Sequence, residues 1–152
     1  YDYFSIIDND VLLPLDWLSK SIDIFKKYDK VGSVGVNVEG LLGPVHLQAI
    51  PGIKDFLVTE CIGGACLTFD KFFKENITLL CEDYGRYGHE DAHVTRQVRQ
   101  LNKVVVCLKD FGIHLGDNDM QIKLNQKNKT YVDWKRSVFN EGLEKLNSNF
   151  KK

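Results

Sequence analysis

Two aspartates, Asp8 and Asp10, follow a short apolar run and are separated by one residue. In open α/β sheets, ligands bind beyond the carboxyl ends of the strands, so two carboxylates at a strand end can reach the same small cation. Mg²⁺ and Mn²⁺ prefer oxygen ligands and often connect a protein to phosphate oxygens. The pair therefore predicts a divalent-metal site, although a solvated turn is the commoner origin of two such aspartates.

A second acidic pair, Glu90 and Asp91, stands at the start of a predicted helix. Acidic residues there complement the helix dipole, which is a sufficient explanation for them. The alternative is a general base that takes a proton from an acceptor hydroxyl. A helix N-terminus lowers the pKa of a carboxyl group and weakens such a base, whereas nearby acids such as Glu82 and Asp83 raise that pKa. The local sequence favours the dipole explanation.

His114 is a third candidate, within a loop expected over residues 111–119. An isolated histidine is usually structural or exposed to solvent. A role in binding metal requires that the fold bring it near Asp10. The other three histidines have no comparable argument.

The segment Gly63-Gly64-Ala65 interrupts an apolar stretch. Glycines in such a place indicate either a plain turn or a close approach of the backbone to a ligand. The sequence around them does not distinguish these two interpretations.

The elements that must position these residues alternate between strands and helices. Strands are predicted from apolar runs and period-two alternation, and helices from apolar residues at helical spacing. The expected strands are Tyr3–Ile7, Val31–Val38, Asp55–Ile62 and Val104–Leu108, and the expected helices are Asp16–Tyr28 with Asp16 as cap, Asp70–Asn76, Glu90–Leu101 and Tyr131–Phe150. This order predicts an α/β layer architecture in a single domain over residues 1–152, with a C-terminal helical tail over residues 130–152.

Helical spacing also predicts which side chains of the longer helices are buried. These are Leu18, Ile22 and Phe25 in the first helix, Val94, Val98 and Leu101 in the third, and Trp134, Val138, Leu143 and Leu146 in the last.

Composition excludes several classes of function. The chain has 20 basic and 21 acidic residues and a net charge of -1, which argues against nonspecific binding to nucleic acid or anionic membranes. No apolar run approaches the roughly 20 residues of a membrane span, and we expect no signal peptide. The four cysteines have no zinc-site spacing and favour a reducing compartment, so we expect a cytoplasmic location.

Together these segments resemble the family 2 glycosyltransferases of the GT-A fold. The matching segments are, in order, Ile6–Pro14 with Asp16–Leu18, Gly63–Leu67 and Tyr87–Asp91, followed by His114 and Trp134-Lys135. The resemblance covers the chain from Tyr3 to about Leu146. It implies a partial GT-A fold, a Rossmann-like mixed sheet flanked by helices. In this family an N-terminal nucleotide-binding half precedes the first segment, and we expect that this half is missing here.

The resemblance also implies roles for individual residues. Asp8 and Asp10, with His114, are expected to hold Mn²⁺ or Mg²⁺ and the donor diphosphate, and Asp91, with Glu90, to supply the catalytic base. The residues expected to line the substrate site are Asn9, Gly63, Gly64, Ala65, Glu82 and Asp83.

The implied function is transfer of a sugar from a nucleoside-diphosphate sugar, with a uridine diphosphate sugar favoured, to a hydroxyl of a glycan or another acceptor. The cation neutralises charge on the departing diphosphate, Asp91 deprotonates the acceptor, and the anomeric configuration is inverted. No nucleic-acid partner is expected, and the parent protein is placed in the cytoplasm or at the cytoplasmic face of a membrane. Without the missing half, weak donor binding and little activity are expected.

Two alternatives remain. A phosphatase of the haloacid dehalogenase type would use Asp8 as the nucleophile and Asp10 as the acid/base, with Gly116-Asp117 and Asp119 as a later acidic motif. That assignment leaves the glycine segment and the second acidic pair unexplained. The other alternative is a truncated carbohydrate-binding module without catalytic activity.

Overall fold

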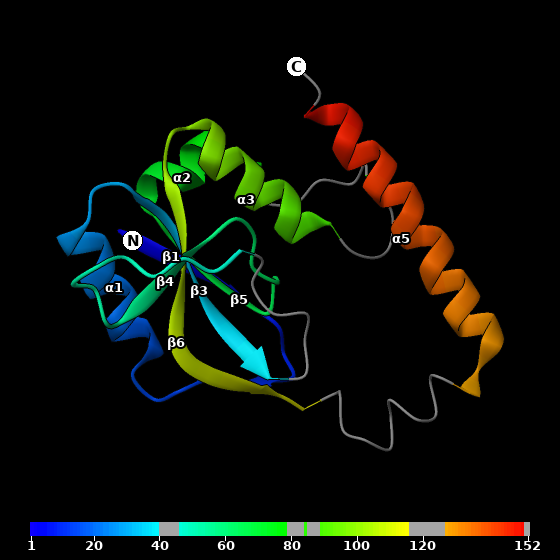
Figure 1. Ribbon diagram of the computed structural model, residues 1–152, viewed down its shortest axis with the longest axis horizontal. Coiled ribbons are helices and arrows are strands. Elements are labelled where there is room, and N and C mark those ends of the chain that lie inside the picture. Colours follow the sequence, from blue (N-terminus) through cyan, green and yellow to red (C-terminus); the bar gives the residue numbers. More distant parts are fainter. Residues whose placement is uncertain (40–45, 79–83, 85–88, 116–126, 151–152) are drawn as a thin grey trace.

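A mixed β-sheet with helices on both faces forms the centre of the protein (Figure 1). The computed structural model describes residues 1–39, 46–78, 84, 89–115 and 127–150. Its strands are β1 (Tyr3–Ile7), β2 (Val11–Leu12), β3 (Val31–Glu39), β4 (Phe56–Thr59), β5 (Cys66–Asp70) and β6 (Val104–His114). Its helices are α1 (Trp17–Lys27), α2 (Lys71–Asn76), α3 (Glu90–Gln100) and α5 (Lys129–Asn149). The predicted α/β architecture is confirmed.

The strands lie in the order β1-β5-β3-β6-β2, and β4 also pairs with β6. β3 and β6 run parallel, whereas the remaining pairs are antiparallel. One edge of β6 is covered by β3, and the other edge pairs first with β4 and then with β2. β6 therefore organises half of the sheet, and its end meets the short strand that follows the first aspartate pair.

Apolar side chains fill two layers, one on each face of the sheet. In β6, Val106 and Leu108 belong to the cluster under α1, whereas Val105 and Cys107 belong to the cluster under α2 and α3. Successive side chains of a strand point to opposite faces, so an unbroken apolar run is what a strand buried on both faces requires. The helices supply Ile24 and Phe25 on one side and Phe73, Val94 and Val98 on the other.

The first helix differs from its prediction in cap and in buried face. Asp16 occupies the N-cap position, but its backbone angles are outside the extended region of a capping residue, and its carboxylate instead forms a salt bridge with Lys20 at 2.9 Å. The buried side chains are Ser21, Ile24 and Phe25, whereas Leu18 is exposed. Of the predicted residues, Phe25 is buried and Ile22 is half-buried, so the predicted face was wrong only at Leu18.

The last strand is longer than predicted, and it contains His114 as its final residue. The expected loop at this position was wrong, because β3 pairs with β6 as far as Ile113 and β2 adds pairs at the end. The register between β3 and β6 shifts after Val36. Val36 pairs with Leu108 and Asn37 pairs with Phe111, so Lys109 and Asp110 are skipped and the pairing resumes beyond them. Conversely, β4 is shorter than the predicted strand and ends at Thr59, whose hydroxyl donates to the Cys61 carbonyl oxygen at 2.8 Å.

The helix α5 stands apart from the sheet, and only its C-terminal part approaches α3 (Figure 1). Leu146 is buried as predicted, whereas Trp134 and Leu143 are exposed. In α3 the predicted Val94 and Val98 are buried, whereas the predicted Leu101 is exposed. Across the described ranges, every helix is too short or too polar to serve as a membrane span.

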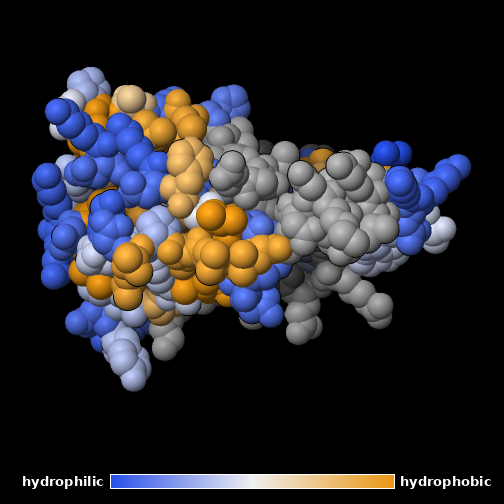
Figure 2. All heavy atoms as spheres, turned by 90° about the horizontal axis from the view of Figure 1, so that it is seen from below, coloured by the Kyte–Doolittle hydropathy of each residue, from blue (hydrophilic) through white to orange (hydrophobic). Residues whose placement is uncertain are grey.

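An apolar surface lies beside the end of β6. Leu12 is directly paired with Ile113, so both side chains lie on the same face of the sheet, and both are exposed together with Phe111 and Leu115. Figure 2 shows apolar side chains gathered on the side seen from below in Figure 1. This surface borders the turn between β1 and β2, because the Leu115 amide donates to the Asp10 carbonyl oxygen.

Candidate metal and catalytic site

The aspartate pair lies in the turn between β1 and β2. The strand β1 ends at Ile7, and β2 then pairs with the end of β6 through Val11 and His114. Two backbone hydrogen bonds hold the turn: the Asp8 amide donates to the Ala65 carbonyl oxygen at 3.0 Å, and the Leu115 amide donates to the Asp10 carbonyl oxygen at 2.7 Å. Antiparallel pairing therefore places the histidine beside the aspartates.

Asp8, Asp10 and His114 form a cluster in which one ligand atom from each residue lies within 4.8 Å of the others. His114 Nε2 lies 3.4 Å from Asp10 Oδ1. Two carboxylates and an imidazole suit a divalent cation, with the oxygens favouring Mg²⁺ or Mn²⁺ and the nitrogen favouring a transition metal over Mg²⁺. The donor set therefore fits the expected cation, and Mn²⁺ in particular.

The electrostatics of Asp8 also suit a cation. Partial desolvation raises the pKa of the Asp8 carboxyl group, although the residue as a whole is exposed, and the Asp10 carboxylate raises it further. The charge of His114 opposes this rise, and the charge of Glu90 adds to it. Several negative groups thus share one region, where a bound cation relieves their repulsion.

The turn at Gly63–Ala65 connects this cluster to the second acidic pair. Ala65 is buried and accepts the hydrogen bond from the Asp8 amide. Its neighbour Gly64 lies against the start of α3, where a Cβ on Gly64 would be 3.5 Å from the Cβ of Asp91. The predicted turn thus carries both contacts, one to each acidic segment.

Asp91 is the better protected carboxylate of the second pair. Burial raises the pKa of its carboxyl group, and hydrogen bonds from the backbone amides of Ala92 and Gly64 lower it in part. The Ala92 amide lies 2.6 Å from Asp91 Oδ1. Glu90 is exposed and close enough to influence Asp8. Burial is the largest cause of the raised pKa of Asp91. The neighbouring acids invoked from the sequence, Glu82 and Asp83, lie outside the described residues.

Not every predicted residue enters this arrangement. Asn9 is exposed in the turn between the aspartates. Glu82 and Asp83, predicted to line the substrate site, lie outside the described residues, as does the 116–119 segment of the phosphatase alternative.

His89, which precedes the second acidic pair, was not among the residues predicted for the site. It is buried, occupies the N-cap position of α3 with a φ of 74°, and its Nε2 lies 2.7 Å from the Phe139 carbonyl oxygen of α5. A left-handed conformation at histidine has no clear sequence signal. Gly142, inside α5, was the available clue, because a glycine within a helix often has a packing reason.

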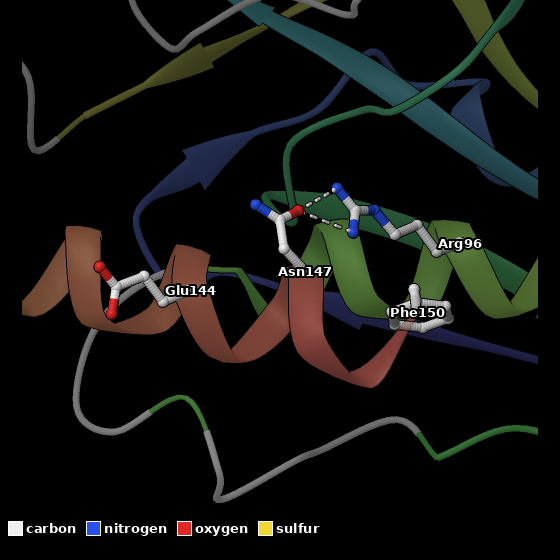
Figure 3. A pocket seen from close by; sticks show the side chains of 4 residues that line it. All are labelled: Arg96, Glu144, Asn147 and Phe150. Atoms are coloured by element: carbon white, nitrogen blue, oxygen red, sulfur yellow. Dashed lines mark hydrogen bonds between the residues drawn. The ribbon is translucent and has the colours of Figure 1, made fainter. Parts of the chain in front are cut away.

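A pocket of about 500 Å³ lies elsewhere, between α3 and α5, and is lined by Arg96, Glu144, Asn147 and Phe150. Figure 3 shows Arg96 directed at Asn147, with both guanidinium NH₂ groups 3.3 Å from Asn147 Oδ1. Its residues include none of the carboxylates described above. We therefore assign the pocket to the packing of the two helices and not to the chemistry.

No known protein-family profile matches the chain, and no curated protein matches it. Among solved structures, the crystal structure of A197 from STIV is similar, with 16% sequence identity and a TM-score of 0.46. The alignment covers 71% of this chain and 54% of that one, so the chain spans about half the length of that structure. A similarity of this size identifies neither a family nor a function.

Proposed function

We propose that the chain is the metal-binding and catalytic part of a glycosyltransferase resembling family 2 of the GT-A fold. The parent protein would transfer a sugar from a nucleoside-diphosphate sugar to an acceptor hydroxyl. The observation that carries the proposal is the meeting of three segments that are distant in sequence. The turn at Asp8–Asp10 is hydrogen-bonded to the turn at Gly63–Ala65, which in turn contacts the start of α3 at Asp91.

Different residues would bind the cation and accept the proton in such a reaction. Asp8, Asp10 and His114 would hold a divalent cation, which supplies positive charge beside the departing nucleoside diphosphate when bound. Asp91 would accept the acceptor's hydroxyl proton. The acceptor oxygen bonds to the anomeric carbon as the bond from that carbon to the phosphate oxygen breaks, and the leaving diphosphate keeps the electron pair. One displacement inverts the configuration.

Burial supports the role of Asp91. A general base works best when its pKa lies near the working pH, and burial raises the pKa of this carboxyl group towards that range. The hydrogen bonds from Ala92 and Gly64 fix the carboxylate in one orientation. A positioned base loses less entropy when it meets its substrate.

The first test is Mn²⁺ titration calorimetry on the wild-type chain and on Asp10→Ala, each with and without uridine diphosphate. We expect the substitution to weaken Mn²⁺ binding by at least tenfold, because it removes one of three ligands. Asp23→Ala is the matched control, since it removes an exposed aspartate of α1 that lies outside the cluster. Zn²⁺ and Mg²⁺ titrations then rank the metals.

Equal Mn²⁺ affinity in wild type and Asp10→Ala would remove the central support of the proposal. Sugar transfer by the full-length parent is the second arm, with Asp91→Asn expected to lower kcat by at least a hundredfold, as loss of a general base does. Phosphate release from a phosphomonoester without sugar transfer would favour the phosphatase alternative. Metal binding without turnover in the parent would favour the non-catalytic module.

A further inference from the structure

The backbone immediately before the acidic pair adopts an unusual conformation. His89 has a φ of 74°, in the left-handed region, which few residues other than glycine adopt. It begins α3 directly, and its carbonyl oxygen accepts the hydrogen bond of the His93 amide at 2.8 Å. A strained residue keeps such a conformation only when its surroundings enforce it, and such residues gather at functional sites.

The surroundings that enforce it come from α5. His89 Nε2 is hydrogen-bonded to the Phe139 carbonyl oxygen at 2.7 Å, and the two rings lie 4.2 Å apart between centroids. Gly142 leaves the space that the imidazole occupies, because a Cβ there would lie 2.6 Å from His89 Cδ2. A distance under 3.0 Å would force the ring or the helix to move.

Further contacts hold α5 along α3. Tyr84 is hydrogen-bonded to His93, and Asn149 Nδ2 donates to the Tyr84 hydroxyl at 3.3 Å. The Arg96 guanidinium carbon lies 5.6 Å from the centre of the Phe150 ring (Figure 3). These contacts involve His93 and Arg96, one and two turns beyond His89, so the position of α5 does not depend on His89 alone.

We propose that His89 is a positioning residue through which the docked helix α5 aims Glu90 and Asp91 at the site. Gly142 and Phe139 fix its ring, the ring fixes the left-handed backbone, and that backbone sets the direction in which α3 begins. The catalytic part of this inference rests on the function proposed above. The mechanical part, from α5 to the start of α3, stands on the contacts alone.

The test uses substitutions that leave every site group unchanged. Gly142→Ala places a methyl group against the imidazole and is expected to lower kcat of the full-length parent by at least tenfold. The KM for the donor and the Mn²⁺ affinity should change less than twofold, because the residues of the metal cluster come from the β1–β2 turn and from β6 and not from α5. Ser137→Ala, on an exposed position of the same helix, is the control and should behave as wild type.

A double-substitution cycle shows whether the imidazole transmits the effect. His89→Gly tolerates the left-handed backbone but lacks the ring, so it should lower kcat less than Gly142→Ala. In His89→Gly/Gly142→Ala the methyl group has no ring to displace, and the double variant should match His89→Gly alone. Additive losses of the two single substitutions would overturn the proposal.

A second readout needs no catalysis. The Ala92 amide donates to Asp91, so its chemical shift in a ¹H–¹⁵N NMR spectrum of the chain reports where that carboxylate lies. Gly142→Ala should move this resonance, and Ser137→Ala should not. An unmoved Ala92 resonance with α5 still docked overturns the positioning role, even if the parent transfers sugar. A moved resonance in a parent that transfers no sugar supports the positioning role and contradicts only the proposed function.

Discussion

At the scale of single residues, the site combines carboxylates in two environments. Asp8 is exposed and Asp10 is partly buried, which would leave both accessible to a cation. Asp91 is half-buried behind the glycine turn, and desolvation raises the pKa of its carboxyl group. Environments that separate the protonation behaviour of acidic groups let one site hold a metal and also carry a base. The same burial lowers the stability of the folded chain when the Asp91 carboxyl group is charged.

Asp91→Asn is therefore expected to stabilise the chain by about 1 kcal/mol at neutral pH. Burial raises the pKa of Asp91 in the folded state, so the folded chain binds the proton more tightly than the unfolded chain does. Stability from this group is complete below the unfolded pKa of 3.8 and is lost as pH rises through the folded pKa. Urea denaturation at several pH values measures the effect.

The advantage of Asp91→Asn should shrink as pH falls towards 3.8, because the wild-type carboxyl group becomes neutral there. Glu90→Gln is the control, since its carboxylate is exposed. A variant less stable than wild type at neutral pH would mean that the hydrogen bonds to Asp91 outweigh its desolvation.

At the scale of elements, strand pairing and helix docking do the positioning. The sequence predicted the aspartate turn, the glycine turn and the start of α3, because each has a local signal. It placed His114 in a loop, since the pairing partner of that residue is Val11, which is distant in sequence, and strand formation depends on such partners. Helical periodicity likewise predicted Trp134 as buried, because periodicity identifies an apolar face but not whether anything covers it.

The close packing of β3 against α2 and α3 gives a prediction at the scale of elements. A Cβ on Gly32 would lie 2.6 Å from Val98, 2.7 Å from Phe73 and 2.8 Å from Lys103, so three neighbours from different elements would have to move together. Gly32→Ala is expected to destabilise the chain by about 1–3 kcal/mol, as overpacking of a core does. The measurement is the shift in the denaturation midpoint.

Gly64→Ala is the matched control for Gly32→Ala, because the nearest atom to its Cβ would be 3.5 Å away, an ordinary contact distance. Its midpoint should stay close to that of wild type. Equal losses in the two variants would mean that backbone freedom, and not the crowding around Gly32, decides the outcome.

At the scale of the whole molecule, the cluster forms only when the first turn of the chain and the end of β6 are brought together by the sheet. Asp8 and Asp10 come from the first turn of the chain, and His114 comes from the end of its last strand. In the described part of the chain, the two ends meet through the β2–β6 pair and through the hydrogen bond from the Leu115 amide to the Asp10 carbonyl oxygen. The three ligands therefore lie together only when the strands between them are in place.

Because the β2–β6 pairing brings the proposed ligands together, binding of an ion would indicate that the chain has folded. The two sides of this pairing are separated by about a hundred residues, a long loop whose ends must be brought together against chain entropy, so an unfinished chain has no complete set of ligands. An ion that binds only the folded state adds about 2.7 kcal/mol to the unfolding free energy at a hundred times its dissociation constant. Mn²⁺ should raise the melting temperature of the wild-type chain but not that of Asp10→Ala, and equal rises would place the ion elsewhere. In a growing polypeptide, capture of the metal would mark the moment at which the sheet is finished.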